Sequence, residues 1–228
     1  MTTAPRQLIL DLAHRSALDR EDFLISQSNE AAVELIDAAE TWPHRALLLT
    51  GPQGSGKSHL ANVFRLTHGA DLVEAAALSE EAIGRLEAAG ALVVEDLDRG
   101  IADERVLFHL LNMGRQGGGL ILMTSRLPPG QLPLTLPDLR SRARALPLAQ
   151  IEAPDDFLLQ AVLVKLFTVR QLTVEPGIVR FLATRMERSM QAANAVVSEI
   201  DRLALAMRRK VSKQLAQAAL DRISGQPS

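Results

Sequence analysis

The sequence contains no cysteine among its 228 residues. Disulfides and thiolate metal sites are therefore excluded, and a reducing compartment is the natural setting. The sequence also lacks any apolar run near the roughly 18 residues that a membrane-spanning helix needs, and it lacks an apolar N-terminal run of signal length. We therefore expect a soluble, cytoplasmic protein that does not bind membranes.

An excess of positive charge is absent as well. Lysine and arginine number 25 against 27 acidic residues, so the net charge is −2 and the pI is about 6.2. This balance argues against a whole-protein electrostatic attraction to nucleic acid. We interpret the small basic cluster at 208–210 as a complement to a helix C-terminus, and we predict no direct sequence-specific DNA binding. The five histidines show no metal-ligand spacing.

A glycine-rich segment, Gly51–Ser58, fits the phosphate-binding pattern of Gly, four residues, Gly-Lys and then Ser or Thr. Residues 45–50 before it are expected to form a buried strand, and residues 59–66 after it a helix. The glycines let backbone N–H groups turn towards a phosphate, and the helix N-terminus adds partial positive charge. Lys57 would supply a charge to the outer phosphates, and Ser58 a hydroxyl to Mg²⁺. The predicted nucleotide-binding residues of this segment are Gly51, Gln53, Gly54, Ser55, Gly56, Lys57, Ser58 and His59.

Apolar runs alternate with helical patterns in the first two thirds of the chain. This alternation predicts an α/β fold in which helices flank a mostly parallel five-stranded sheet. The expected strands are 45–50, 71–75, 91–96, 120–124 and 145–148.

From about residue 151 the strand patterns stop, and helical patterns predict a small all-α lid. Its expected helices are 155–169, 176–185, 189–207 and 212–223. The core candidates of the first of these are Phe157, Leu158, Val162 and Phe167. We expect four parts: an arm over 1–19, an α/β subdomain over 20–150, the lid over 151–223, and a disordered tail over 224–228.

Polar residues follow two of the expected strands. Glu95 and Asp96 end one strand, and Ser125 and Arg126 follow another. The carboxyl ends of parallel strands meet at one edge of a sheet, where ligands bind. One carboxylate there can hold Mg²⁺ and a second can orient an attacking water. We therefore predict Glu95 and Asp96 as catalytic and metal-binding residues, together with Ser58 as a metal ligand.

The order of these motifs, followed by the segment 136–142 (Leu-Pro-Asp-Leu-Arg-Ser-Arg) and a helical lid, resembles the AAA+ ATPases of the DnaA group. The resemblance covers about residues 20–222. It implies an AAA+ fold, with Arg142 as an arginine finger and Ser125 and Arg188 as the two nucleotide sensors. It also implies that Phe23 and Leu24 belong to the segment that encloses the adenine.

Within the DnaA group the sequence resembles the Hda family of short regulators, because no helix-turn-helix pattern follows the lid and no long domain precedes the arm. This resemblance implies that Gln7-Leu8-Ile9-Leu10-Asp11-Leu12 docks on the sliding clamp, the β subunit of DNA polymerase III. Gln7, Leu8, Leu10 and Leu12 would make the contacts, with apolar side chains in a pocket. The alternative is a tail whose leucines fold back onto the core.

The acidic pair departs from the usual pattern, which opens with Asp where this chain has Glu95. If the strand shifts by one residue, Asp96 becomes the metal ligand and Leu97 stands at the water-orienting position. Either register predicts weak intrinsic ATPase activity.

The resemblance implies a protein that binds ADP or ATP with Mg²⁺ and stimulates hydrolysis by ATP-loaded DnaA, its Arg142 acting in trans. Two alternatives stay open: an autonomous AAA+ ATPase of helicase or clamp-loader type, and a nucleotide-stabilised clamp adaptor. A homo-oligomer also stays open.

Overall fold

The computed structural model describes residues 23–207 and 209–225, so the predicted clamp-binding segment Gln7–Leu12 lies outside the described residues. The chain forms a five-stranded, wholly parallel sheet with the strand order β2-β3-β4-β1-β5. The strands are β1 (Ala46–Thr50), β2 (Asp71–Glu74), β3 (Ala91–Glu95), β4 (Leu120–Ser125) and β5 (Leu148–Gln150). The predicted α/β class is confirmed, and β1, which leads into the glycine-rich loop, lies inside the sheet between β4 and β5.

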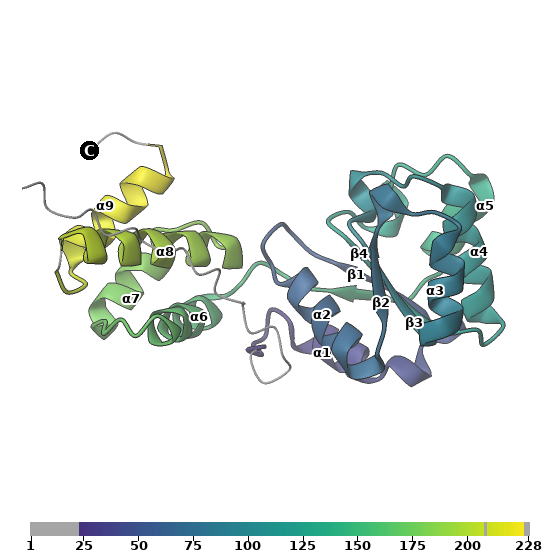
Figure 1. Ribbon diagram of the computed structural model, residues 1–228, viewed down its shortest axis with the longest axis horizontal. Helices are drawn as coiled ribbons and strands as arrows, with labels where there is room; N and C mark the ends of the chain where they lie inside the picture. Colours follow the sequence, from purple (N-terminus) through teal and green to yellow (C-terminus); the bar gives the residue numbers. More distant parts are fainter. Residues whose placement is uncertain (1–22, 208, 226–228) are drawn as a thin grey trace, which may run out of the picture.

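Helices cover both faces of this sheet (Figure 1). They are α1 (Glu30–Asp37), α2 (Lys57–His68), α3 (Glu81–Ala89), α4 (Glu104–Arg115) and α5 (Pro137–Arg144). Because side chains alternate along a strand, Leu47 and Leu49 of β1 pack with α1 and α2, while Ala46 and Leu48 pack with α3, α4 and α5. Burial on both faces explains why the strands are apolar runs without polar alternation.

The last third of the chain is helical and has a core of its own. Its helices are α6 (Asp156–Val169), α7 (Pro176–Ala183), α8 (Met190–Met207) and α9 (Lys213–Ile223). They pack around buried Leu163 and Phe167 and lie together on one side of the α/β part (Figure 1). Asp155 caps α6, because its carboxylate accepts a hydrogen bond from Leu158 N at 2.7 Å. The predicted α/β core and helical lid are both present.

Two local predictions are wrong. The last strand is Leu148–Gln150 instead of 145–148, because Ala145 and Leu146 still bond back to carbonyls of α5. Phe157 is not a core residue: it is 72% exposed in the first turn of α6, whereas Leu158 and Phe167 are buried. Within the described residues, no helix has both the length and the apolar character to cross a membrane.

The core beneath the glycine-rich loop depends on one aromatic pair. Phe64 of α2 is fully buried and stacks on Trp42 with ring centroids 5.4 Å apart. We predict that Phe64→Ala lowers the free energy of unfolding by about 3–5 kcal/mol, because it leaves a cavity beside the sheet. Urea unfolding can be followed by the fluorescence of Trp42, the single tryptophan of the chain. Leu66→Ala on the same helix, at a side chain 51% exposed, is the matched control. Equal losses in the two variants would contradict this account.

Candidate nucleotide site

The glycine-rich loop joins β1 to α2 at the carboxyl edge of the sheet, and its backbone excludes larger residues. Gly54 has a φ of +71°, and a Cβ there would lie 2.7 Å from the Cβ of Ser189. A Cβ on Gly51 would lie 2.4 Å from the carbonyl oxygen of Ile151. Glycine is therefore required at both positions, for conformation at the first and for space at both.

Lys57 opens α2 with its ammonium group folded against the loop. Nζ donates to the carbonyl oxygens of Gly51 at 2.8 Å and Pro52 at 2.9 Å. Burial lowers the pKa of Lys57, while the nearby carboxylates of Asp96 and Asp98 act to raise it. The lysine thus lies within the electrostatic field of the β3 tip.

Glu95 is the last residue of β3, and Asp96 follows in a left-handed conformation with a φ of +59°. Asp96 N donates to Thr124 Oγ1 at 3.0 Å, and its carboxylate pairs with Arg99 Nε at 3.1 Å. Glu95 Oε1, in contrast, is buried without a hydrogen-bond partner among the described residues. A buried carboxylate oxygen without a donor is unfavourable, and a bound cation would compensate it.

The donor set at this edge suits Mg²⁺ held partly by phosphate. Among the described residues, no group of three or more His, Cys, Asp or Glu side chains is arranged to hold a metal ion. Mg²⁺ is commonly bound by one or two carboxylates together with nucleotide phosphates and water. Glu95 with its uncompensated oxygen, and Ser58, exposed in the first turn of α2, fit that mode. Ser55 Oγ in the loop is also buried without a partner among the described residues.

Ser125 lies at the predicted edge, with its hydroxyl engaged locally. It is the last residue of β4, fully buried, and paired in register with Thr50, which immediately precedes the loop. Its Oγ accepts a hydrogen bond from Leu127 N at 2.9 Å.

The next residue, Arg126, forms an ion pair that the sequence analysis missed. Its backbone N donates to Asp98 Oδ1 at 2.7 Å and its Nε to Asp98 Oδ2 at 2.5 Å. Burial alone would raise the pKa of Asp98, but the hydrogen bonds and the charge of Arg126 hold it below its usual value. The available signal was an acid soon after one strand tip and an arginine directly after the neighbouring tip.

The lid contacts the glycine-rich loop directly. Met190 N donates to Gly54 O at 2.7 Å, and Gln53 Nε2 lies 3.3 Å from Gln191 Oε1. Arg188, the predicted second sensor, immediately precedes this contact. Its guanidinium forms an ion pair with Asp156 and donates to Pro154 O at 3.3 Å. The structure thus brings this stretch of the lid to the loop, with the Arg188 side chain bound within its own lid segment.

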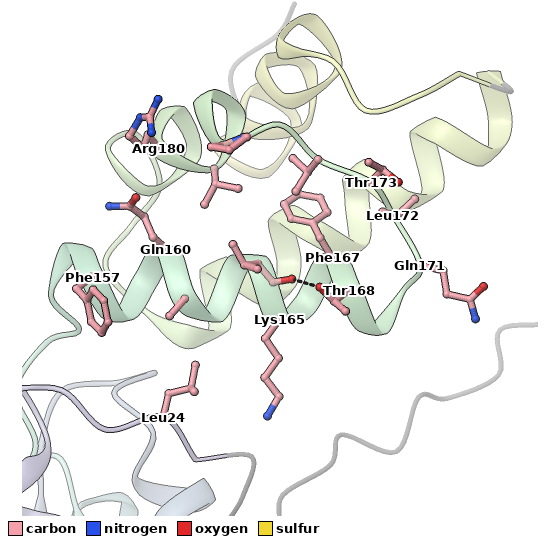
Figure 2. Close-up of a pocket in the computed structure, with 15 residues that line it drawn as sticks. Leu24, Phe157, Gln160, Lys165, Phe167, Thr168, Gln171, Leu172, Thr173 and Arg180 are labelled. Atoms are coloured by element: carbon pink, nitrogen blue, oxygen red, sulfur yellow. Dashed lines mark hydrogen bonds between the residues drawn. The ribbon is translucent and has the colours of Figure 1, made fainter.

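The two predicted adenine-segment residues contact different parts of the structure. Phe23 is buried, with its ring edge-on to that of His59 at a centroid distance of 5.1 Å. Leu24 instead lines a lid groove of about 1040 Å³, formed mainly by residues of α6 and α7 (Figure 2). Phe157 lines the same groove, and no residue of the glycine-rich loop does. Asn29 fixes the segment, since Nδ2 donates to Leu24 O at 2.9 Å.

Arg142 lies on α5, which is on the side of the α/β part away from the lid (Figure 1). It is half-buried, and its guanidinium carbon lies 4.7 Å from the centre of the Phe108 ring of α4. Glu104, a further residue missed from sequence, fixes the entry to this helix. Its carboxylate accepts hydrogen bonds from Thr135 N and Leu136 N, both at 2.7 Å.

No family model matches this chain. Among curated proteins it is similar to the chromosomal replication initiator protein DnaA of Cutibacterium acnes, with 26% identity over 225 residues. That alignment covers 88% of this chain and 45% of the relative, so the chain spans less than half the length of that protein. The chain is thus DnaA-like in sequence.

Solved structures share the fold. Domain III of Thermotoga maritima DnaA matches with a TM-score of 0.72 and 18% identity, covering 90% of this chain and 95% of that one. DnaA from Aquifex aeolicus, bound to AMPPCP, matches at 0.68 and 17%, with 81% and 64% covered. The Thermotoga maritima RuvB Holliday junction branch migration motor matches at 0.69 and 15%, with 89% and 71% covered. The fold is therefore an AAA+ α/β core followed by a helical lid.

Glu104 provides a test of how the α5 segment is anchored. Burial raises the pKa of Glu104, but hydrogen bonds from Thr135 and Leu136 outweigh it and lower the pKa. A lowered pKa stabilises the fold above the unfolded value of about 4.3, and this stabilisation is lost as the pH falls through the folded value. Glu104→Gln should therefore lower the melting temperature at pH 7.

The difference from wild type should shrink as the pH falls below about 4.3. Thermal unfolding between neutral and acidic pH measures it. Glu87→Gln, at an exposed position of α3, is the control and should follow the wild-type curve. A difference that persists unchanged into strong acid would rule out the carboxylate as the anchor.

Proposed function

We propose that this DnaA-like AAA+ chain binds ADP or ATP with Mg²⁺ at the loop Gly51–Ser58. The observation that carries the proposal is the convergence of three features at one sheet edge: the Lys57 ammonium on the loop, the uncompensated Glu95 oxygen, and the lid bond to Gly54. The AMPPCP bound to the Aquifex aeolicus structure of the same fold supports it.

Each residue at this edge has a role in the proposal. Lys57 supplies positive charge to the phosphates, while Ser58 and Glu95 hold Mg²⁺. Mg²⁺ would neutralise charge on the outer phosphates when bound. Asp96 stands where an acid would orient water, but its pairing with Arg99 competes with that task. Weak intrinsic hydrolysis is the expected consequence.

Lys57→Met tests nucleotide binding. It removes the ammonium but retains the length of the side chain, and the loss of a charge-assisted contact should weaken binding of a fluorescent ADP analogue at least about tenfold. Lys210→Met, at an exposed lid position, is the matched control and should bind as the wild type does. Unchanged affinity in Lys57→Met, with folding confirmed by thermal melting, would remove the loop from the proposed site.

The regulatory role is a second step of the proposal. The chain docks on the sliding clamp through Gln7–Leu12 and places Arg142 beside the nucleotide of DnaA, whose ATP hydrolysis it stimulates. This limits re-initiation of replication in the cytoplasm. Support comes from the position of Arg142, half-exposed on a helix away from its own lid and lying over the Phe108 ring. An arginine supplied in trans can raise hydrolysis by about 10³–10⁵-fold.

Arg142→Ala should leave nucleotide and clamp binding intact and reduce stimulation of DnaA hydrolysis by at least about 10³-fold, or to background if wild-type stimulation is smaller. Phosphate release from ATP-loaded DnaA, with clamp and DNA present, is the measurement. Arg144→Ala on the same helix removes an exposed arginine and should stimulate normally. Full stimulation by the Arg142 variant would reject its role as a finger.

Two other functions give different outcomes in the same experiments. The similarity of fold to the RuvB motor favours an autonomous ATPase as the second candidate. Turnover of the isolated protein above about 1 s⁻¹ would support it, since typical enzymes reach at least that rate. A clamp adaptor would lose function on deletion of residues 7–12 and retain it in Arg142→Ala.

A further inference from the structure

The ion pair between Asp98 and Arg126 lies at the nucleotide edge, and none of the roles above uses it. The Asp98 side chain is 1% exposed, and the pair is made through two hydrogen bonds, at 2.7 Å from the Arg126 backbone N and 2.5 Å from Nε. A buried carboxylate bound at both oxygens fixes the backbone and the side chain of its partner together. Asp98 therefore determines where the Arg126 guanidinium lies.

That position is beside the glycine-rich loop. Ser125 pairs in register with Thr50 on the adjacent strand, so Arg126 and Gly51 each follow one of two paired residues. Adjacent strands lie about 4.8 Å apart. The charge of Arg126 also acts on Lys57, lowering its pKa, in the direction opposite to Asp98. Arg126 is thus a second cation at the edge where the outer phosphates of a nucleotide would lie.

The guanidinium retains unused donors. Asp98 takes the Nε–H, and Nη1 and Nη2 make no hydrogen bond to any other described residue. The Arg126 side chain is 42% exposed, so these outer nitrogens can reach solvent or a ligand. Guanidinium N–H groups in a planar fork match the oxygens of a phosphate.

We propose that Arg126, positioned by Asp98, contacts the terminal phosphate of a bound nucleoside triphosphate and makes the site favour ATP over ADP. The proposal rests on nucleotide binding at the loop and adds the group that distinguishes the two nucleotides. Lys57 lies on the loop itself and serves both ligands. Arg126 follows the neighbouring strand and contacts a phosphate that ADP lacks.

The test is the ratio of two dissociation constants, for ADP and for the non-hydrolysable triphosphate AMPPCP, measured by calorimetry with Mg²⁺. Arg126→Gln should weaken AMPPCP binding at least about tenfold and leave ADP binding nearly unchanged. Asp98→Asn should lower the preference for AMPPCP in the same direction, since it releases the guanidinium. Arg85→Gln, which removes an exposed arginine paired with Asp71 at the far edge of the sheet, is the control and should leave the ratio unchanged.

Arg126→Gln leaves the buried Asp98 carboxylate without its partner and can destabilise the fold. The double variant Asp98→Asn/Arg126→Gln removes that charge too, so it keeps the ratio measurable in a stable protein. Because both residues act through one contact, the double variant should lose no more preference than Arg126→Gln alone. A purely structural pair would instead weaken both nucleotides equally and lower the melting temperature.

The outcomes separate this inference from the proposal on which it rests. If the wild type binds both nucleotides and Arg126→Gln leaves their ratio unchanged, the role of Arg126 is overturned while nucleotide binding stands. If the folded wild type binds neither nucleotide, both proposals fail. A selective loss of AMPPCP affinity in Arg126→Gln and in the double variant, with Arg85→Gln unchanged, supports the assignment.

Discussion

The parallel register of the central strands is the constraint on which the candidate site depends. Thr50 lies beside Ser125, and the backbone N of Asp96 bonds to the Thr124 hydroxyl, so three strand tips end at one level. Residues far apart in the chain therefore meet at one edge with their charges close together. A change of one residue in register would exchange the two faces of a strand and move Glu95 away from the loop.

The lid extends this edge through contacts that need glycine. Gly54 adopts a positive φ and leaves no room for a Cβ next to Ser189, which allows Met190 to bond to its carbonyl oxygen. The same loop therefore serves two purposes: its backbone can surround a phosphate, and it joins the helical part to the α/β part. Nucleotide binding at the loop would act directly on the contact between the two parts.

Two arginines occupy contrasting positions in this structure. Arg126 is fixed by a buried carboxylate next to the chain's own glycine-rich loop, whereas Arg142 lies over an aromatic ring on a helix away from the lid. Proposed roles towards the chain's own nucleotide and towards that of a partner thus fall to separate groups. Glu104, which anchors the start of α5, belongs to the second of these arrangements.

The sequence by itself determined the features that have a local signature. The loop Gly51–Ser58 has fixed spacing, the central strands are continuous apolar runs, and the lid helices have apolar residues at helical spacing. Local pattern misjudged β5, because its three residues are defined by pairing with β1, and it misjudged Phe157, because an apolar residue at a helix start can face outward.

Tertiary structure alone decided the long-range pairs. Asp98 and Arg126 are 28 residues apart, Glu104 and Thr135 are 31 apart, and neither pair has a motif. The orphaned oxygen of Glu95 likewise emerges only when its surroundings are known. The physical reason is that hydrogen bonding and burial of a charged group depend on which elements the fold brings together, and spacing along the chain does not encode this.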